Sequence, residues 1–196
     1  MIFHPLRRYR NFMKSVANRC FILRCALNNI KCTIGKGSVV KGCSLTSRGS
    51  GIIKIGDYCD IRHTCFKFYD DGGCIDIRNY VFFNARPKHR NGIMSVKGHT
   101  KITIDEECLF SNSIDIATTD WHAVIDKNGD RINHDKDVYI GKHVWIGRKV
   151  TVCKGVSIAE NSIIGTGSVV TKPFTESNVV IAGNPAKICK RDVSWK

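Results

Sequence analysis

Acidic residues are missing from the first 56 positions of this 196-residue chain, and Asp57 is the first of them. The same stretch holds eleven lysines and arginines, and the formal net charge of the chain is +14. A basic arm of this kind can contact nucleic acid, anionic lipid or an anionic substrate. Because no nucleic-acid-binding motif and no aromatic residues interleaved on strands accompany it, we expect no nucleic acid partner.

Long apolar runs are also missing. No run reaches the roughly 18 residues of a membrane-spanning helix, and the stretch from Cys20 to Leu27 is short and interrupted by Arg24. The N-terminus lacks a long apolar core followed by a small-residue cleavage site, so we expect no cleaved signal peptide. The length suits one globular domain with a small appendage, and we expect a cytoplasmic protein.

Cysteine pairs of the C-x-x-C type are absent, although the chain has 10 cysteines. Their absence removes support for a zinc knuckle or a redox motif. Cys59, Cys65 and Cys108 occupy a position of the repeat described below that favours a small buried side chain. We therefore expect the cysteines to be reduced and to act as small apolar fillers.

Basic and apolar residues interleave over residues 1–31, a pattern typical of one or two amphipathic helices. We assign this range to a helical N-terminal segment. Two interpretations of it stay open: a helix that packs against the body of the protein, or one that makes a weak contact with the inner membrane surface.

A hydrophobic residue recurs at every sixth position in several blocks, and we call these positions lead residues. The longest block is Ile140, Ile146, Val152, Ile158, Ile164 and Val170. Six is a multiple of the strand period of two but a poor multiple of 3.6, so a helix would lose its apolar face. A short strand and a turn, repeated three times, close a triangular coil whose stacked copies pair in parallel. The pattern predicts an all-β, parallel β-helix over residues 32–178, closed by residues 179–196.

The blocks of this repeat are not all in phase. Residues 46–51 and 69–74 are rich in glycine, serine and aspartate, which indicates irregular turns. The stretch 126–136 is too polar for a packed coil. We expect a loop of about residues 121–137 to leave the stack.

The segment from Val138 to Arg191, with HVWIG, IIGTGSVVTK and AGNPAKI, resembles the left-handed β-helix acyltransferases built from hexapeptide repeats. The resemblance covers roughly residues 33–191 and is loose before residue 100. TTDWHAVID followed by RIN is similar to sugar O-acetyltransferases of capsule, O-antigen or exopolysaccharide synthesis. The resemblance implies a single-stranded left-handed helix, acetyl-CoA as co-substrate, and a homotrimer with active sites between subunits.

His122 matches the catalytic histidine of the family motif, in TDWH. A sugar hydroxyl is a weak nucleophile, and histidine, with an ordinary pKa of about 6.5, suits the role of general base. Asp120 is the favoured orienting partner because side chains two apart on a strand share a face, with Asp115 and Asp126 as alternatives. Since no G-x-S-x-G elbow occurs, we expect direct attack on the thioester.

The remaining site candidates bind the acceptor or the co-substrate. The resemblance implies acceptor binding by Asn84, Trp121 and Asn133. Small residues allow close backbone approach to coenzyme A, cationic side chains can meet its phosphates, and the AGNPAK turn contacts adenine in relatives. The candidates for coenzyme A binding are Trp145, Gly147, Lys154, Thr166, Gly167, Ser168, Lys172, Asn184, Pro185, Lys187 and Arg191.

Two rival functions fit a β-helix in principle. A γ-carbonic-anhydrase-like zinc site needs histidines five residues apart, but Ala117 and Lys127 stand five residues either side of His122, so we expect no metal. A β-helix can also be a binding module without catalysis. Within acetyltransferases, an amino sugar or serine is the alternative to a glycan hydroxyl as acceptor.

Overall fold

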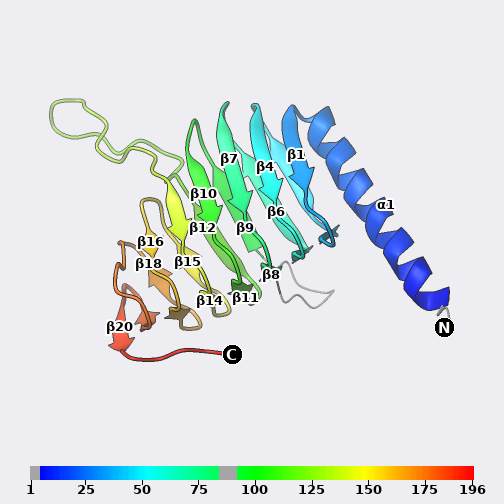
Figure 1. Cartoon of the computed structure of the whole chain (residues 1–196). Helices are drawn as coiled ribbons and strands as arrows, with labels where there is room; N and C mark the ends of the chain where they lie inside the picture. The colour runs from blue at the N-terminus through cyan, green and yellow to red at the C-terminus, as the bar shows by residue number, and fades with distance from the viewer. Residues whose placement is uncertain (1–4, 84–91) are drawn as a thin grey trace.

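The chain folds as one helix followed by a stack of short strands (Figure 1). A computed structural model describes residues 5–83 and 92–196, with side chains from residue 13 onward. Helix α1 (Pro5–Leu27) comes first. It is a single helix, whereas the sequence pattern allowed either one or two helices. Among the described residues, no helix combines the length and the apolar character that crossing a bilayer requires.

The strands form three sheets, named A, B and C, that the chain visits in turn. Sheet A contains β1 (Ile30–Ile34), β4 (Gly51–Ile55), β7 (Gly73–Ile77), β10 (Lys101–Ile104), β13 (Val138–Ile140) and β16 (Ser157–Ile158). Sheet B contains β2 (Val39–Lys41), β5 (Asp60–Arg62), β8 (Phe82–Phe83), β11 (Leu109–Phe110), β14 (Trp145–Ile146), β17 (Ile163–Ile164), β19 (Val180–Gly183) and β20 (Ala186–Lys190). Sheet C contains β3 (Ser44–Ser47), β6 (Thr64–Phe68), β9 (Gly92–Val96), β12 (Ile114–Ala117), β15 (Thr151–Val152) and β18 (Val169–Val170).

All strand pairs are parallel except the closing pair of β19 and β20. Because the order A, B, C repeats along the chain, the three sheets are the faces of a triangular prism, and six coils stack along its axis (Figure 1). The all-β parallel β-helix expected from the six-residue period is therefore confirmed.

The lead residues of the repeat fill the prism. Those of the long block, from Ile140 to Val170, are each 0% exposed. The aromatic leads stack in the same column, with the rings of Phe83 and Phe110 at 4.4 Å. One apolar stack along the axis holds the coils together, since no coil can bury its own inner face.

The turns between sheets share one backbone conformation. In the long block, the third residue after each of the first five leads has positive φ, between 54° and 75°, namely His143, Lys149, Gly155, Asn161 and Gly167. Such φ values are uncommon for residues other than glycine. Here each one redirects the chain by one corner of the prism, whatever side chain the position carries.

The first four coils are longer than eighteen residues, and each of them has additional residues at the edge between sheets C and A, which we call the C–A corner. Ile140 pairs with Ile158, eighteen residues on, whereas Ile34 pairs with Ile55, twenty-one residues on. The additional residues follow β3, β6 and β9, where the sequence predicted irregular turns at 46–51 and 69–74. After β12 and the buried Thr118 and Thr119 the chain leaves this corner altogether, and residues 120–137 project from the stack before β13 (Figure 1).

Helix α1 closes the open end of the first coil. Its Phe21 ring lies 5.6 Å from Phe66 inside the prism, and Cys25 is fully buried. The Asn18 side chain donates to Ser38 O at 2.9 Å and accepts from Val40 N at 2.8 Å. These contacts satisfy backbone groups at the end of the stack and fix how the helix is rotated.

The alternation of inward-facing and outward-facing side chains along a strand can be tested with two consecutive isoleucines in β4. Ile53 is 0% exposed and Ile52 is 38% exposed. Ile53→Ala should lower the free energy of unfolding by about 3 kcal/mol, because it leaves a cavity in the prism. Ile52→Ala should change it by less than about 1 kcal/mol. Denaturant titration of both variants is the measurement, and equal losses would contradict the inside–outside assignment.

Candidate active site

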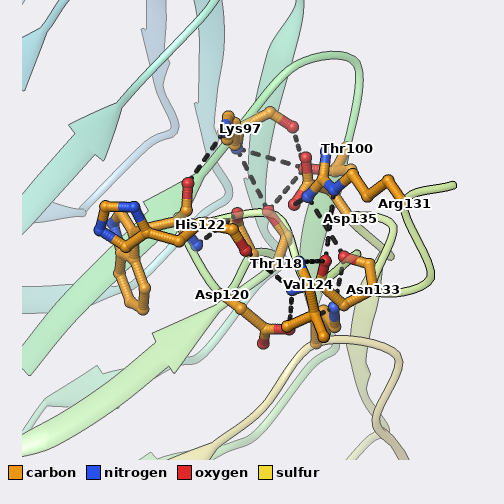
Figure 2. A network of polar contacts seen from close by, with 12 residues as sticks. Lys97, Thr100, Thr118, Asp120, His122, Val124, Arg131, Asn133 and Asp135 are labelled. Carbon is orange, nitrogen blue, oxygen red and sulfur yellow. Dashed lines mark hydrogen bonds and ion pairs between the residues drawn. The ribbon is translucent and has the colours of Figure 1, made fainter. Parts of the chain in front are cut away.

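His122 lies where the projecting loop leaves the C–A corner, after β12. Its side chain is exposed, and no hydrogen bond to its ring occurs among the described residues. Its backbone N–H donates to Asp120 O at 2.7 Å, and the preceding residue, Trp121, has a φ of 63°. In Figure 2 the His122 side chain points away from the polar contacts that tie down the loop. The imidazole is thus available to a ligand on this surface.

A hollow of about 270 Å³ adjoins the imidazole, lined by Arg48, Tyr69, Asp70, Lys97, Trp121 and His122. These residues come from the C–A corner of four successive coils. The rings of Tyr69 and Trp121 meet edge to face at 6.1 Å, and Lys97 Nζ donates to Trp121 O at 3.3 Å. The lengthened corners of the first three coils therefore build the wall that faces His122. The sequence did not identify Arg48, Tyr69, Asp70 or Lys97 as site residues. It did predict irregular turns that contain the first three of them.

The loop is anchored by Asn133, Asp120 and Lys154. Asn133 Nδ2 donates to Asp120 Oδ2 at 2.9 Å and to His122 O at 2.8 Å. Its Oδ1 accepts from Val124 N at 2.7 Å. Lys154 Nζ forms an ion pair with Asp120 at 2.5 Å and donates to Asn133 O at 2.7 Å. Asn133, predicted to bind the acceptor, is therefore occupied in holding the backbone of His122.

Asp120 and Lys154, predicted to serve the histidine and a phosphate, contact each other in the single chain. Burial raises the pKa of Asp120, but hydrogen bonds from Lys154 and Asn133 outweigh it, so the net shift of its pKa is downward. The carboxylate is held by these partners and not by the His122 ring. Lys154, predicted to meet a phosphate, has its ammonium occupied within the loop anchor.

The alternative orienting residues do not contact the ring either. Asp126 accepts from the backbone N–H groups of Asn128 and Asp130 within the loop. Asp115 lies on the outer side of β12; its Oδ1 is buried without a hydrogen-bond partner, and burial raises its pKa. On a single chain, then, no carboxylate in the described residues orients His122.

Trp145 lies on β14, in the face formed by sheet B, and is 37% exposed. In register with it on the outer side are Phe82, Leu109 and Ile163, which form an apolar row across the coils. The ring of Trp195 lies 6.3 Å from Trp145. In a triangular prism, face B is opposite the C–A corner, so Trp145 and His122 of one chain point in different directions.

The small residues predicted to approach coenzyme A lie at the corner between sheets B and C. Thr166 and Gly167 are exposed there. Gly147 has a different explanation, because an added Cβ would meet Ile164 O of the next coil at 2.7 Å. Ser168 is buried, and its hydroxyl donates to Gly165 O and accepts from Gly183 N. Gly147 and Ser168 thus take part in the packing of the coils.

The cationic candidates gather at the C-terminal end. Lys172 and Lys187 line one hollow of about 440 Å³ with Glu176. Arg191 forms an ion pair with Glu176 at 2.8 Å, which reduces its availability to a phosphate. Asn184 and Pro185 form the exposed turn between β19 and β20. Asn84 lies outside the described residues, and within them no cluster of three metal-ligating side chains occurs.

Comparison with known proteins points to one family. Residues 137–172 match the model for "Bacterial transferase hexapeptide (six repeats)". The solved structure of the polysialic acid O-acetyltransferase OatWY is 32% identical, with a TM-score of 0.67, over 86% of this chain and 88% of that one. The chain belongs to the hexapeptide-repeat acetyltransferases.

Two relatives matched by sequence are polysialic acid O-acetyltransferases. The one from Neisseria meningitidis is 46% identical over 60 residues, which is 30% of this chain and 28% of the relative. The one from Escherichia coli is 40% identical over 116 residues, 59% of this chain and 38% of the relative. The matches thus span well under half of either relative's length.

The loop anchor formed by Asn133, Asp120 and Lys154 can be tested by hydrogen exchange. Lys154→Met should make amides of residues 120–137 exchange about fivefold faster, because a partly exposed ion pair is lost. Since the native pKa of Asp120 is lowered, the anchor is complete above the ordinary aspartate pKa of about 3.9 and is lost as the pH falls through the native value. Lys149→Met, at an exposed turn, is the matched control, and equal exchange in both variants would contradict the anchor.

Proposed function

We propose that this protein transfers an acetyl group from acetyl-CoA to a hydroxyl of an acidic sugar in a bacterial surface glycan or its precursor, with His122 as general base. The observation that carries the proposal is the exposed His122 ring beside a hollow lined by Arg48 and Lys97. The family membership supports the reaction class, and the names of the relatives support a glycan acceptor.

The chemistry needs only one proton carrier. As the sugar oxygen attacks the thioester carbonyl, His122 accepts the hydroxyl proton, and the carbonyl oxygen takes on negative charge. The carbon–sulfur bond then breaks, the acetyl group stays on the sugar oxygen, and the imidazolium returns its proton to the departing thiolate. No covalent enzyme intermediate is required.

The charge of the hollow supports an anionic acceptor. Arg48 and Lys97 contribute two positive charges against the one negative charge of Asp70. A carboxylate on the sugar would be attracted to this wall, and a bidentate guanidinium contact is among the stronger ones available to it. Trp121 and Tyr69 offer apolar surface to the ring carbons of the sugar.

The separation of His122 from Trp145 supports a site shared between two copies. A three-fold assembly that packs the C–A corner of one chain against face B of the next would bring the two residues together. The apolar row that includes Phe82 and Trp145 would be covered in that arrangement. We therefore propose a homotrimer whose site combines His122 of one chain with Trp145 of its neighbour.

The path of coenzyme A follows from the same arrangement. From His122 the C–A corner runs toward the hollow that Lys172 and Lys187 line at the C-terminal end. Two ammonium groups there suit the phosphates. Thr166 and Gly167 would approach the pantetheine arm from the neighbouring chain, because they lie at the corner between sheets B and C.

Turnover should depend on His122 while the fold does not. His122→Ala should lower kcat by at least about a hundredfold with acetyl-CoA and a sialic acid oligomer, since general base catalysis is removed. Thiol release measures the rate, and circular dichroism checks the fold. His63→Ala, at the corner between sheets B and C, is the matched control. Near-normal turnover of His122→Ala would exclude this mechanism, and zinc-dependent activity would favour another reaction.

Sharing of the site can be tested by complementation. His122→Ala and Trp145→Ala chains should each be inactive alone. Refolded together in equal amounts, they should recover about one quarter of the sites, because each site needs an intact His122 from one chain and an intact Trp145 from the next. Co-refolding two preparations that carry both substitutions is the control. Absence of recovery in stable mixed trimers would show that each site belongs to a single chain.

A further inference from the structure

Helix α1 carries an apolar stripe that no other part of the described chain covers. Its members are Met13, Val16, Cys20, Leu23 and Leu27, spaced three and four residues apart. All are exposed, Leu23 at 61% and Leu27 at 77%. At 3.6 residues per turn, the stripe occupies an arc of about 80° and extends about 21 Å along the helix.

The rotation of the helix keeps this stripe outward. Phe21 and Cys25 are buried against the first coil, and Asn18 bonds to the backbone at its edge. Arg24 Nη1 donates to Cys43 O at 2.8 Å. Since Phe21, Cys25 and Asn18 hold the opposite face of the helix, the stripe cannot turn inward without breaking their contacts.

Positive charge borders the stripe on both sides. At 100° per residue, Arg19 lies along one edge and Arg24 along the other. No acidic residue occurs in the helix or in the first coil, up to Asp57. Pairing of this stripe with that of a second copy would bring like charges together, whereas an anionic surface would meet complementary charge.

We propose that α1 binds the surface of an anionic lipid bilayer, lying flat with this stripe in the interface and with Arg19 among the headgroups. An apolar face with basic borders and low overall hydrophobicity is the composition of interfacial helices. Each arginine near such a surface adds about fivefold to the binding constant.

Three copies of α1 in one assembly would strengthen the contact with the membrane. This step rests on the proposed trimer. A closed three-fold assembly brings all three copies of α1 to the same end of the prisms. Three weak contacts on one plane then act together, as linked binding sites do. The C–A corner runs along the prism from that end, so a glycan carried on a membrane lipid would reach the hollow beside His122.

The test is co-sedimentation of the full chain with vesicles. Wild type should bind vesicles of phosphatidylglycerol and phosphatidylcholine, weakly or not at all those of phosphatidylcholine alone, and less at high salt. Leu23→Gln should lower the partition coefficient about tenfold, because a leucine leaves the interface. Leu27→Gln, at the end of the helix, is a second variant with little risk to folding. Arg19→Gln should lower the coefficient about fivefold.

The matched control is Ile22→Gln, the same kind of change on the same helix at a side chain outside the stripe. Unchanged binding of that variant, with turnover of soluble acceptor retained in Leu23→Gln, would isolate this surface from the active site. The proposal is overturned if wild type does not bind the anionic vesicles, or if Leu23→Gln binds them as wild type does. It is also overturned if Leu23→Gln reduces the oligomeric mass, because a second copy would then cover the stripe.

Discussion

Parallel pairing between stacked coils is the constraint on which the rest of this molecule depends. Each strand has only two to five residues, so no strand is stable alone. Pairing with the coils above and below satisfies its backbone groups, and the lead residues inside exclude water. The positive φ at five turns of the long block allows this, since it brings the chain around a corner in few enough residues for the next strand to meet its partner.

The corners tolerate change in a way that the faces do not. A residue inserted within a strand would shift its register and turn lead residues outward. A residue inserted at a corner only lengthens the path between two strands. The insertions that surround the hollow all lie at the C–A corner. They are the longer turns of the first three coils and the projecting loop of the fourth. The candidate site therefore lies where the length of the chain can vary without loss of the hydrogen bonds between coils.

The prism also separates the functions that a transferase has to combine. A corner presents loops and charged side chains, and a face presents a flat row of alternating residues. The general base candidate and the exposed tryptophan occupy these two kinds of surface, on opposite sides of one chain. Assembly corner to face would unite them, and the loop anchor of Asp120, Lys154 and Asn133 would then hold His122 in place without contacting its ring.

The sequence by itself determined the fold class and the inner face, because a six-residue period is a local property that any segment of the chain displays. It also singled out His122, through a motif that surrounds the residue. Only the tertiary structure decided the rest. Arg48, Tyr69 and Lys97 meet at one hollow because coil lengths differ, and a partner for Asp120 depends on which side chain comes within bonding distance. The exposed stripe of α1 likewise depended on how the helix is rotated against the first coil, which its own periodicity does not specify.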